Sequence, residues 1–201
     1  MISSAWHRRV VALLPDTLES GSVSLQRCRV AHLDAVLEAI HTSFVELERW
    51  LPFAATMPTV VAERAHLASA ESAFSSDLDW SFTVFETGTS FVVGSAALHR
   101  RADTQHVEVG YWIRSDRTRR GYASSATSLL VHAAFSYLAD LQRVEIRMDE
   151  ANHASVAVPS KLGFAFDRHE ARPKQASGHT GRGLVWVLTR DDWHRQVAAT
   201  A

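Results

Sequence analysis

Cysteine, net charge and long apolar runs are all scarce in this chain of 201 residues. Cys28 is its single cysteine, which excludes an internal disulfide. The formal net charge is −1, so there is no general basic excess of the kind that drives binding to nucleic acid. The apolar run at residues 10–14 ends at Pro15 and is too short for a signal-peptide core or a membrane span. We therefore expect a soluble, cytoplasmic protein with neither a nucleic-acid partner nor a membrane partner.

Metal-ligand spacing is missing as well. The chain has 11 histidines, but none stands in an H-E-x-x-H motif, and the single cysteine allows no C-x-x-C pair. We therefore predict no metal site.

Hydrophobic periodicity predicts one α+β domain. Alternating apolar and polar residues, bounded by turn residues, predict strands at 22–28, 80–86, 91–98, 106–113, 143–148, 164–166 and 184–188. Apolar residues spaced three and four apart predict helices at 30–44, 47–51, 60–74, 126–137 and 152–162. We expect residues 1–20 to form an N-terminal extension, residues 21–195 the domain, and residues 172–183 a mobile loop within it. No repeat is visible, and no linker divides the chain into two cores.

Residues 117–126, Arg-Thr-Arg-Arg-Gly-Tyr-Ala-Ser-Ser-Ala, stand where the strand at 106–113 gives way to a helix. The N–H groups of a first helical turn have no partner within the helix, and the helix dipole adds positive potential there. Gly121 lets the backbone approach a ligand closely. This segment therefore predicts an anion site, for which phosphate is the best-suited ligand.

Three further features point to chemistry. Glu108 lies on the central strand at 106–113 between apolar neighbours, where an acid is uncommon unless it is paired or functional, and we expect it to be buried. Asn152 precedes a helix and predicts an N-cap. Pro159 stands four residues after Ser155 and cannot donate a hydrogen bond to its carbonyl, which predicts a bent helix and a carbonyl free for solvent or ligand.

The order of these elements and five short motifs resemble the GCN5-related N-acetyltransferase (GNAT) superfamily, most closely its RimJ/RimL-type branch, over residues 23–193. The motifs are Trp-Leu-Pro-Phe at 50–53, Glu-Val-Gly-Tyr-Trp at 108–112, Arg-Arg-Gly-Tyr-Ala at 119–123, Asn-His-Ala-Ser at 152–155 and Lys-Leu-Gly-Phe at 161–164. Each motif is weak alone, but together and in this order they are specific. The resemblance implies a single α+β (α/β/α) domain with a mixed central sheet of about six to seven strands, flanked by helices and splayed at the strand ending near Arg114.

The resemblance also implies an acetyl-CoA-dependent N-acetyltransferase that works by direct attack in a ternary complex. Acetyl-CoA would be the cosubstrate and a primary amine, either a protein N-terminus or a small molecule, the acceptor; a homodimer is compatible with this reading. Glu108 would be the general base, acting through a water, and Ser155 the general acid that protonates the departing thiolate. The implied donor-binding residues are Ile113, Arg114, Arg119, Arg120, Gly121, Tyr122, Ala123, Ser124 and Asn152, and the implied acceptor-binding residues are Trp50, Phe53 and Trp112. Thr118 departs from the glutamine, arginine or aromatic residue usual at its place in the family's loop.

Three alternatives stay open. The donor is succinyl-CoA or another acyl-CoA if basic residues near the acyl pocket bind a second carboxylate, and Arg100, Arg101, Arg172, Lys174 and Arg182 are the candidates. The chain is a non-catalytic acyl-CoA-binding module if it binds the donor without releasing CoA. Nucleic-acid binding through residues 117–120 is the third, and the near-neutral charge and the lack of an aromatic stacking platform argue against it.

Overall fold

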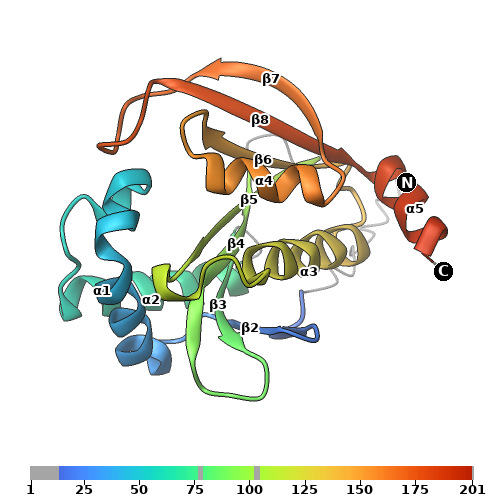
Figure 1. The fold of residues 1–201 in the computed structure, drawn as a ribbon. Helices are drawn as coiled ribbons and strands as arrows, with labels where there is room; N and C mark the ends of the chain where they lie inside the picture. The colour runs from blue at the N-terminus through green and yellow to red at the C-terminus, as the bar shows by residue number, and fades with distance from the viewer. Residues whose placement is uncertain (1–13, 77–78, 102–104, 201) are drawn as a thin grey trace, which may run out of the picture.

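A computed structural model describes residues 14–76, 79–101 and 105–200 (Figure 1). The strands are β1 (Thr17–Glu19), β2 (Val23–Arg27), β3 (Asp79–Glu86), β4 (Val92–Arg100), β5 (His106–Ile113), β6 (Arg143–Asp149), β7 (Ala165–Ala171) and β8 (Arg182–Thr189). The helices are α1 (Leu33–Trp50), α2 (Val60–Ser75), α3 (Tyr122–Tyr137), α4 (His153–Lys161) and α5 (Arg190–Thr200), with 3₁₀ turns η1 (Val30–His32), η2 (Pro52–Ala54) and η3 (Ser115–Arg117).

The eight strands of the described residues form one mixed sheet in the order β1-β2-β3-β4-β5-β6-β8-β7. Each neighbouring pair is antiparallel except β5 and β6, which run parallel. The first five strands therefore form a meander. After β5 the chain crosses through α3 before it returns to the sheet as β6, as a parallel connection requires.

Helices cover both faces of this sheet. On β3, Val84 belongs to the large core that includes Leu130 of α3, whereas its neighbour Phe85 packs with Ile40 of α1. Because successive strand side chains point to opposite faces, α3 lies on one face and α1 on the other. Figure 1 shows α4 beside α3, and the two helices are in contact.

The pairing of β5 with β6 is short. Residues 106–108 pair with residues 143–145, and beyond these positions neither strand, both of them fully described, pairs with the other. The rest of β5 keeps its pairing with β4 up to Ile113, and the rest of β6 pairs with β8. The two strands therefore separate, which confirms the predicted splay at the end of β5.

The separation leaves one edge of β5 open. The Arg114 N–H donates to the Val93 carbonyl of β4 at 2.9 Å. Because hydrogen-bonding directions alternate along a strand, the even-numbered residues of β5 face β4, whereas Val109, Tyr111 and Ile113 turn their N–H and C=O groups toward the gap. An extended ligand could pair with these groups as a further strand would.

The α+β class and the order of the predicted elements are confirmed, but the sheet has eight strands rather than about six to seven. β1 lies within residues 1–20, the expected extension, and pairs with β2. The helices expected at 30–44 and 47–51 are one helix, α1, because nothing breaks it before Pro52. Pro52 holds the preceding residue, Leu51, in an extended conformation at φ −119° and ψ 119°.

The C-terminal helix α5 was not predicted, because its polar composition hides a single anchoring side chain. Trp193 packs against the core, and its ring stacks on Phe135 of α3 at 5.3 Å between centroids. No helix among the described residues combines the length and the apolar character that crossing a bilayer requires.

Candidate active site

The corner between β5 and α3 contains two residues with a left-handed backbone. Arg119 has φ 61°, and Gly121, the N-cap of α3, has φ 86°. A positive φ is uncommon for a residue with a side chain. The left-handed Gly121 directly precedes the right-handed residues of α3, an arrangement that turns successive N–H groups to one side. The first hydrogen bond within α3 runs from the Ser125 N–H to the Gly121 carbonyl at 2.9 Å. The N–H groups of residues 122–124 therefore have no partner within the helix and are available to an anion.

The side chains of this corner are divided between solvent and core. Arg119 and Arg120 are exposed, and residues 123–124 are half-buried. The ring of Tyr122 is buried in the core, and its hydroxyl donates to the Glu86 carboxylate. Tyr122 can therefore offer a ligand its backbone N–H but not its side chain.

Arg114 supports the corner from inside the protein. Its side chain is 4% exposed and donates to Glu38 of α1 at 2.7 and 3.0 Å and to Asp116 at 2.7 and 3.3 Å. Hydrogen bonds from Arg114 hold the pKa of Glu38 and the pKa of Asp116 below their usual values. The backbone N–H and carbonyl of Arg114 are both bonded within the protein. The structure thus corrects the expectation that Arg114 pairs with the donor, whereas Ile113 has backbone groups turned toward the gap.

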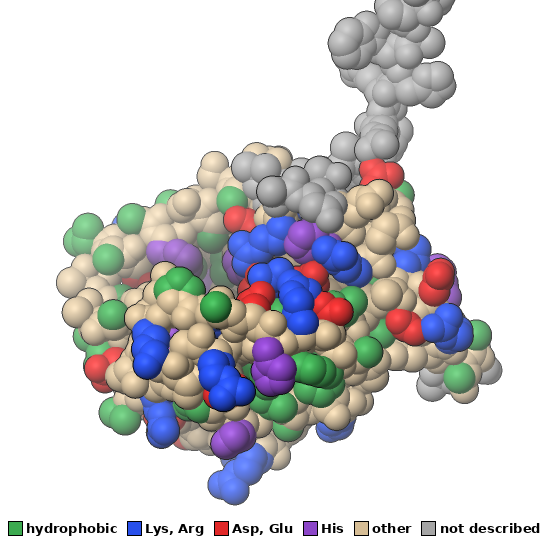
Figure 2. All heavy atoms as spheres, turned by 90° about the horizontal axis from the view of Figure 1, so that it is seen from above, with side chains coloured by type: hydrophobic (Ala, Val, Ile, Leu, Met, Phe, Trp, Pro, Cys, Tyr) green, Lys and Arg blue, Asp and Glu red, His purple; other side chains and the backbone are tan. Residues whose placement is uncertain are grey.

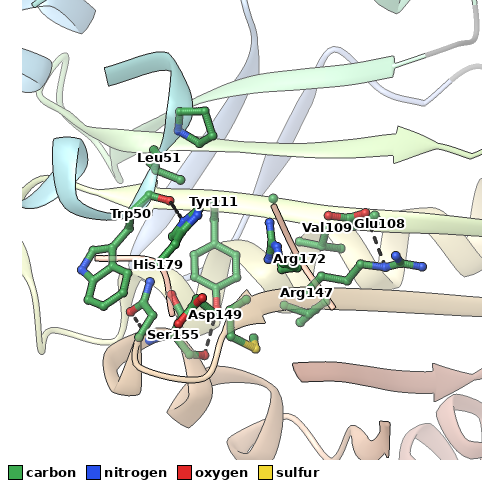
Figure 3. Close-up of a pocket in the computed structure, with 15 residues that line it drawn as sticks. Trp50, Leu51, Glu108, Val109, Tyr111, Arg147, Asp149, Ser155, Arg172 and His179 are labelled. Atoms are coloured by element: carbon green, nitrogen blue, oxygen red, sulfur yellow. Dashed lines mark hydrogen bonds and ion pairs between the residues drawn. The ribbon is translucent and has the colours of Figure 1, made fainter. Parts of the chain in front are cut away.

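A cavity of about 160 Å³ opens where β5 and β6 separate. It is lined by the end of α1, both strands, the start of α4 and the loop between β7 and β8, through Trp50, Leu51, Pro52, Glu108, Val109, Gly110, Tyr111, Ile146, Arg147, Met148, Asp149, Asn152, Ser155, Arg172 and His179. Figure 3 shows Glu108 beside Arg147 at one end of this group, and Trp50, Asp149 and Ser155 at the other. We call it the acceptor cavity below. Of the predicted site residues, Trp50, Glu108, Asn152 and Ser155 share it.

Glu108 lies between two guanidinium groups. Its carboxylate accepts from the Arg101 Nε at 3.0 Å and from an Arg101 terminal nitrogen at 2.5 Å, and the Arg147 Nε is 3.7 Å away. The Glu108 side chain is 17% exposed. Glu108 is therefore paired, as one of the two expectations for an acid at this position had it, and its side chain is only partly buried. Strand alternation turns residues 107 and 109 into the core but Glu108 to the other face, where Arg101 follows the end of β4.

The first turn of α4 holds Ser155 at the cavity. The Asn152 Oδ1 accepts the Ser155 N–H at 3.2 Å, which confirms the predicted N-cap. Pro159 leaves the Ser155 carbonyl without its helical donor, but this carbonyl is not free, because the Tyr111 hydroxyl donates to it at 3.2 Å. Burial raises the pKa of Tyr111, so the hydroxyl stays protonated as a donor. Tyr111 thus connects β5 to the turn that carries Ser155.

The loop between β7 and β8 is fastened to the end of α1. The Gly178 N–H donates to the Arg49 carbonyl at 2.9 Å, and the His179 Nε2 donates to the Trp50 carbonyl at 3.0 Å. We expected a mobile loop at residues 172–183, and these bonds instead hold it over the acceptor cavity. They join positions far apart in the sequence, so periodicity does not reveal them.

The same loop is fastened to the end of β6. The Asp149 carboxylate accepts from the Thr180 N–H at 2.9 Å, from the Thr180 hydroxyl at 3.0 Å and from the Ala151 N–H at 3.1 Å. Burial alone would raise the pKa of Asp149, but these hydrogen bonds together hold it below its usual value. Asp149 is therefore an ionised anchor for the loop.

Phe53 and Trp112 do not share the acceptor cavity with Trp50. They line a separate cavity of about 60 Å³, together with Glu63 and His66 of α2. Glu63 is 6% exposed, and burial raises its pKa. The expected acceptor-binding residues are therefore divided between two cavities. Trp112 lies further along β5, where it packs with the cluster that includes Ile40 of α1.

Basic and acidic side chains are intermingled on the face that carries β7 and β8, which Figure 2 views from above. Arg147 pairs with Glu145 at 2.7 Å and with Glu170 at 3.2 Å. Arg168 pairs with its neighbour Asp167. This face therefore presents no continuous basic surface to a phosphate backbone. Among the residues that the structure describes, no group of three His, Cys, Asp or Glu side chains could hold a metal ion.

Residues 22–165 match the family model of the acetyltransferase (GNAT) domain. The chain belongs to the GNAT acetyltransferases. The match spans β2 to the start of β7 and includes the corner before α3 and most of the acceptor cavity. In this GNAT chain, the corner and most of the cavity thus lie within the matched domain, whereas Arg172 and His179 lie beyond it.

Solved structures show the same fold. RimJ of Mycobacterium smegmatis in complex with CoA-disulfide has a TM-score of 0.78 at 22% identity, covering 92% of this chain and 95% of that chain. RimL, a ribosomal L7/L12 alpha-N-protein acetyltransferase in complex with coenzyme A, has a TM-score of 0.78 at 16% identity, with 89% and 98% covered. The microcin C7 self-immunity acetyltransferase MccE, in complex with acetyl-CoA and AMP, has a TM-score of 0.79 at 12% identity, with 89% and 99% covered.

Several residues of this GNAT cavity were missing from the predicted site. Tyr111 lies inside the recognised Glu-Val-Gly-Tyr-Trp motif, and Asp149 follows directly on a predicted strand, so both had a sequence signal. Arg172 and His179 stand in an irregular segment. Arg172 was named only as one of five candidates for binding a second carboxylate, because of its charge, and His179 had no sequence signal. They reach the cavity because the hairpin of β7 and β8 folds back over it.

Proposed function

We propose that this chain transfers the acetyl group of acetyl-CoA directly to a primary amine, either a protein N-terminus or a small-molecule amine. The observation that supports it best is the gap between β5 and β6, which has an anion site at one end and the acceptor cavity at the other. A CoA thioester has the matching features, a pyrophosphate, an extended amide-bearing arm and a reactive carbonyl.

The donor would bind through backbone groups. The N–H groups of residues 122–124 receive the pyrophosphate, with Arg119 and Arg120 adding positive charge at the surface. The pantetheine amides pair with the open edge of β5 at Val109, Tyr111 and Ile113. This places the thioester carbonyl at the acceptor cavity.

The amine would enter the acceptor cavity from the side of Trp50. A protein α-amine has a pKa of roughly 8, so most of it carries a proton that must leave before attack. Glu108 accepts this proton through a water, and the amine nitrogen then bonds to the thioester carbon. The tetrahedral intermediate collapses and the C–S bond breaks. Ser155 gives a proton to the thiolate, and the proton that the nitrogen loses as it becomes an amide returns to Ser155. The products are the amide and CoA.

Release of CoA thiol tests this proposal. Purified protein is given acetyl-CoA with peptides, aminoglycosides or polyamines, and we expect Glu108→Gln to lower kcat about 100-fold without changing acetyl-CoA binding. Glu48→Gln, an exposed acid on α1, is the matched control. Full kcat of Glu108→Gln across about pH 6–9 would remove Glu108 from the role of base.

Ser155→Ala should lower kcat, whereas Ser160→Ala, an exposed serine on the same helix, should leave it unchanged. Equal rates for the two variants would remove Ser155 from the role of acid. Binding of acetyl-CoA without thiol release for any acceptor would favour a non-catalytic module instead.

The likeness to RimJ and RimL supports a protein N-terminus as the acceptor, because the RimL structure is named as an alpha-N-protein acetyltransferase. A peptide panel with varied first residues, compared with the small amines, tests this preference.

A further inference from the structure

Arg172 differs from the other charged side chains of the acceptor cavity. Glu108 is paired with Arg101, Arg147 is paired with Glu145, and Asp149 is bonded by the loop. Among the residues that the structure describes, the Arg172 side chain has no hydrogen bond and no counter-charge. The cavity thus contains one cation that is not neutralised from within.

The position of Arg172 is built into the hairpin of β7 and β8. Its N–H donates to the Gly181 carbonyl at 3.0 Å at the base of the loop. Its stem crosses β8 at Gly183, where a Cβ would lie 2.7 Å from the Arg172 Cδ and 3.0 Å from its Cγ. Because Gly183 has no side chain, the aliphatic part of the Arg172 side chain has room to cross β8 and reach the cavity. Figure 3 shows the guanidinium between the Tyr111 ring and Val109.

A half-buried guanidinium without a counter-charge is suited to a carboxylate. Its planar fork donates two parallel hydrogen bonds to the two oxygens, and charge-assisted bonds of this kind are stronger than neutral ones. The neighbours of Arg172 in Figure 3 lie on the edge of β5 that, in the proposed function, pairs with the donor beside its thioester. A carboxylate bound here would therefore stand next to the reacting carbonyl.

We propose that Arg172 binds a substrate carboxylate in the acceptor cavity. The carboxylate comes either from the acyl group of a dicarboxylic donor such as succinyl-CoA, or from an amine acceptor that carries one. The inference rests on the proposed function, since it assumes that acyl donor and amine meet in this cavity.

Two donors and two acceptors separate these sources. Thiol release is measured for wild type and Arg172→Gln with acetyl-CoA or succinyl-CoA, and with the dipeptide Ala-Ala or its C-terminal amide. Arg182→Gln is the matched control, because Arg182 lies in the same hairpin, is exposed and pairs with Glu150 outside the cavity.

We expect Arg172→Gln to lower kcat/KM about 10- to 100-fold for the substrate that carries the relevant carboxylate, as the loss of a charge-assisted bond does. A loss confined to succinyl-CoA identifies the donor, and a loss confined to free Ala-Ala identifies the acceptor. Arg182→Gln should leave kcat/KM unchanged for all four combinations of donor and acceptor. Gly183→Ala should lower kcat/KM for the same substrate as Arg172→Gln does, but by a smaller factor, because the added Cβ displaces the aliphatic part of the Arg172 side chain.

An equal loss for all four combinations, or no loss for any, would overturn the inference. If neither these combinations nor the wider panel of amines used to test the proposed function releases thiol, the proposed function fails. Calorimetry then measures the Kd of each of the same four ligands for wild type and for Arg172→Gln, which tests the inference separately. A Kd that rises in the variant only for ligands that carry the carboxylate supports the inference. A Kd that the substitution leaves unchanged for all four ligands refutes it.

Discussion

The corner before α3 and the acceptor cavity differ in how they are made. The corner is one continuous segment that acts through backbone N–H groups and the conformations of two residues, Arg119 and Gly121. The acceptor cavity is assembled from side chains of five separate segments, brought together by the separation of two strands and by a loop that folds over them. A site made from contiguous backbone is visible in a short motif, whereas a site made from distant side chains depends on tertiary contacts.

The largest effect should come from breaking the support beneath the corner. In the double variant Glu38→Gln and Asp116→Asn, Arg114 stays buried without a counter-charge, and we expect the free energy of unfolding to fall by about 3 kcal/mol. Urea denaturation measures it. Glu71→Gln, which breaks an exposed pair with Arg29, should cost only a few tenths of a kcal/mol.

This network should also respond to pH. The pKa values of Glu38 and Asp116 are lowered in the folded state, so their stabilisation is present above the unfolded values of about 4 and is lost as pH falls through the folded values. The free energy of unfolding of the double variant should therefore fall less on acidification than that of wild type. An identical acid profile for the variant and wild type would show that the network contributes nothing.

A smaller effect, confined to the cavity, should follow from loosening its loop. A Cβ on Gly178 would lie 2.6 Å from the Arg49 Cγ and 2.7 Å from the Arg49 carbonyl oxygen, so Gly178→Ala must push the loop away from α1. At an overpacking cost of about 1–3 kcal/mol, we expect the acceptor KM to rise about tenfold or more while acetyl-CoA binding stays unchanged. Steady-state kinetics measures the acceptor KM, and calorimetry measures the affinity for acetyl-CoA.

Gly21→Ala is the matched control, because a Cβ there meets nothing within 4 Å. Weakened binding of acetyl-CoA to Gly178→Ala would mean that the corner and the acceptor cavity are coupled and are not independent sites.

The smallest effect should come from changing the corner itself. A Cβ on Gly121 also meets nothing within 4 Å, so Gly121→Ala acts through its φ of 86° alone. An alanine in this conformation costs about 1 kcal/mol, which predicts acetyl-CoA binding weakened about fivefold by calorimetry. Gly121→Asn should recover part of the affinity, because asparagine adopts the left-handed region more readily. If Asn binds no better than Ala, the backbone conformation is not what the donor requires.

Sequence reasoning reached the fold and part of the site because those parts are local. The alternation in β5 and the glycine before α3 are encoded within a few residues, and the N-cap at Asn152 is encoded by its neighbours. The same alternation, correctly predicted, places Trp112 on the face of the sheet that α1 covers. Which face each residue occupies was therefore predictable, but which helix covers that face was not.

Other parts could not be predicted because they join distant residues. The partner of the Ser155 carbonyl is Tyr111, and the partner of the Trp50 carbonyl is His179, and neither choice follows from spacing along the chain. The place of Glu108 between Arg101 and Arg147 likewise requires the register of three strands. Long-range pairing decides these contacts.

The loop between β7 and β8 has some residues that bond it to the rest of the protein and others that are exposed. Residues 178–180 hold it to α1 and β6, and the Gln175 N–H donates to the Nδ1 of His179 at 3.2 Å. Residues 173–174 are exposed and make none of these bonds. Substitutions or insertions at residues 173–174 can therefore accumulate without disturbing these bonds or the corner that lies elsewhere in the fold. In the proposed function, such changes would alter which amine fits the acceptor cavity while the donor-binding corner stays the same.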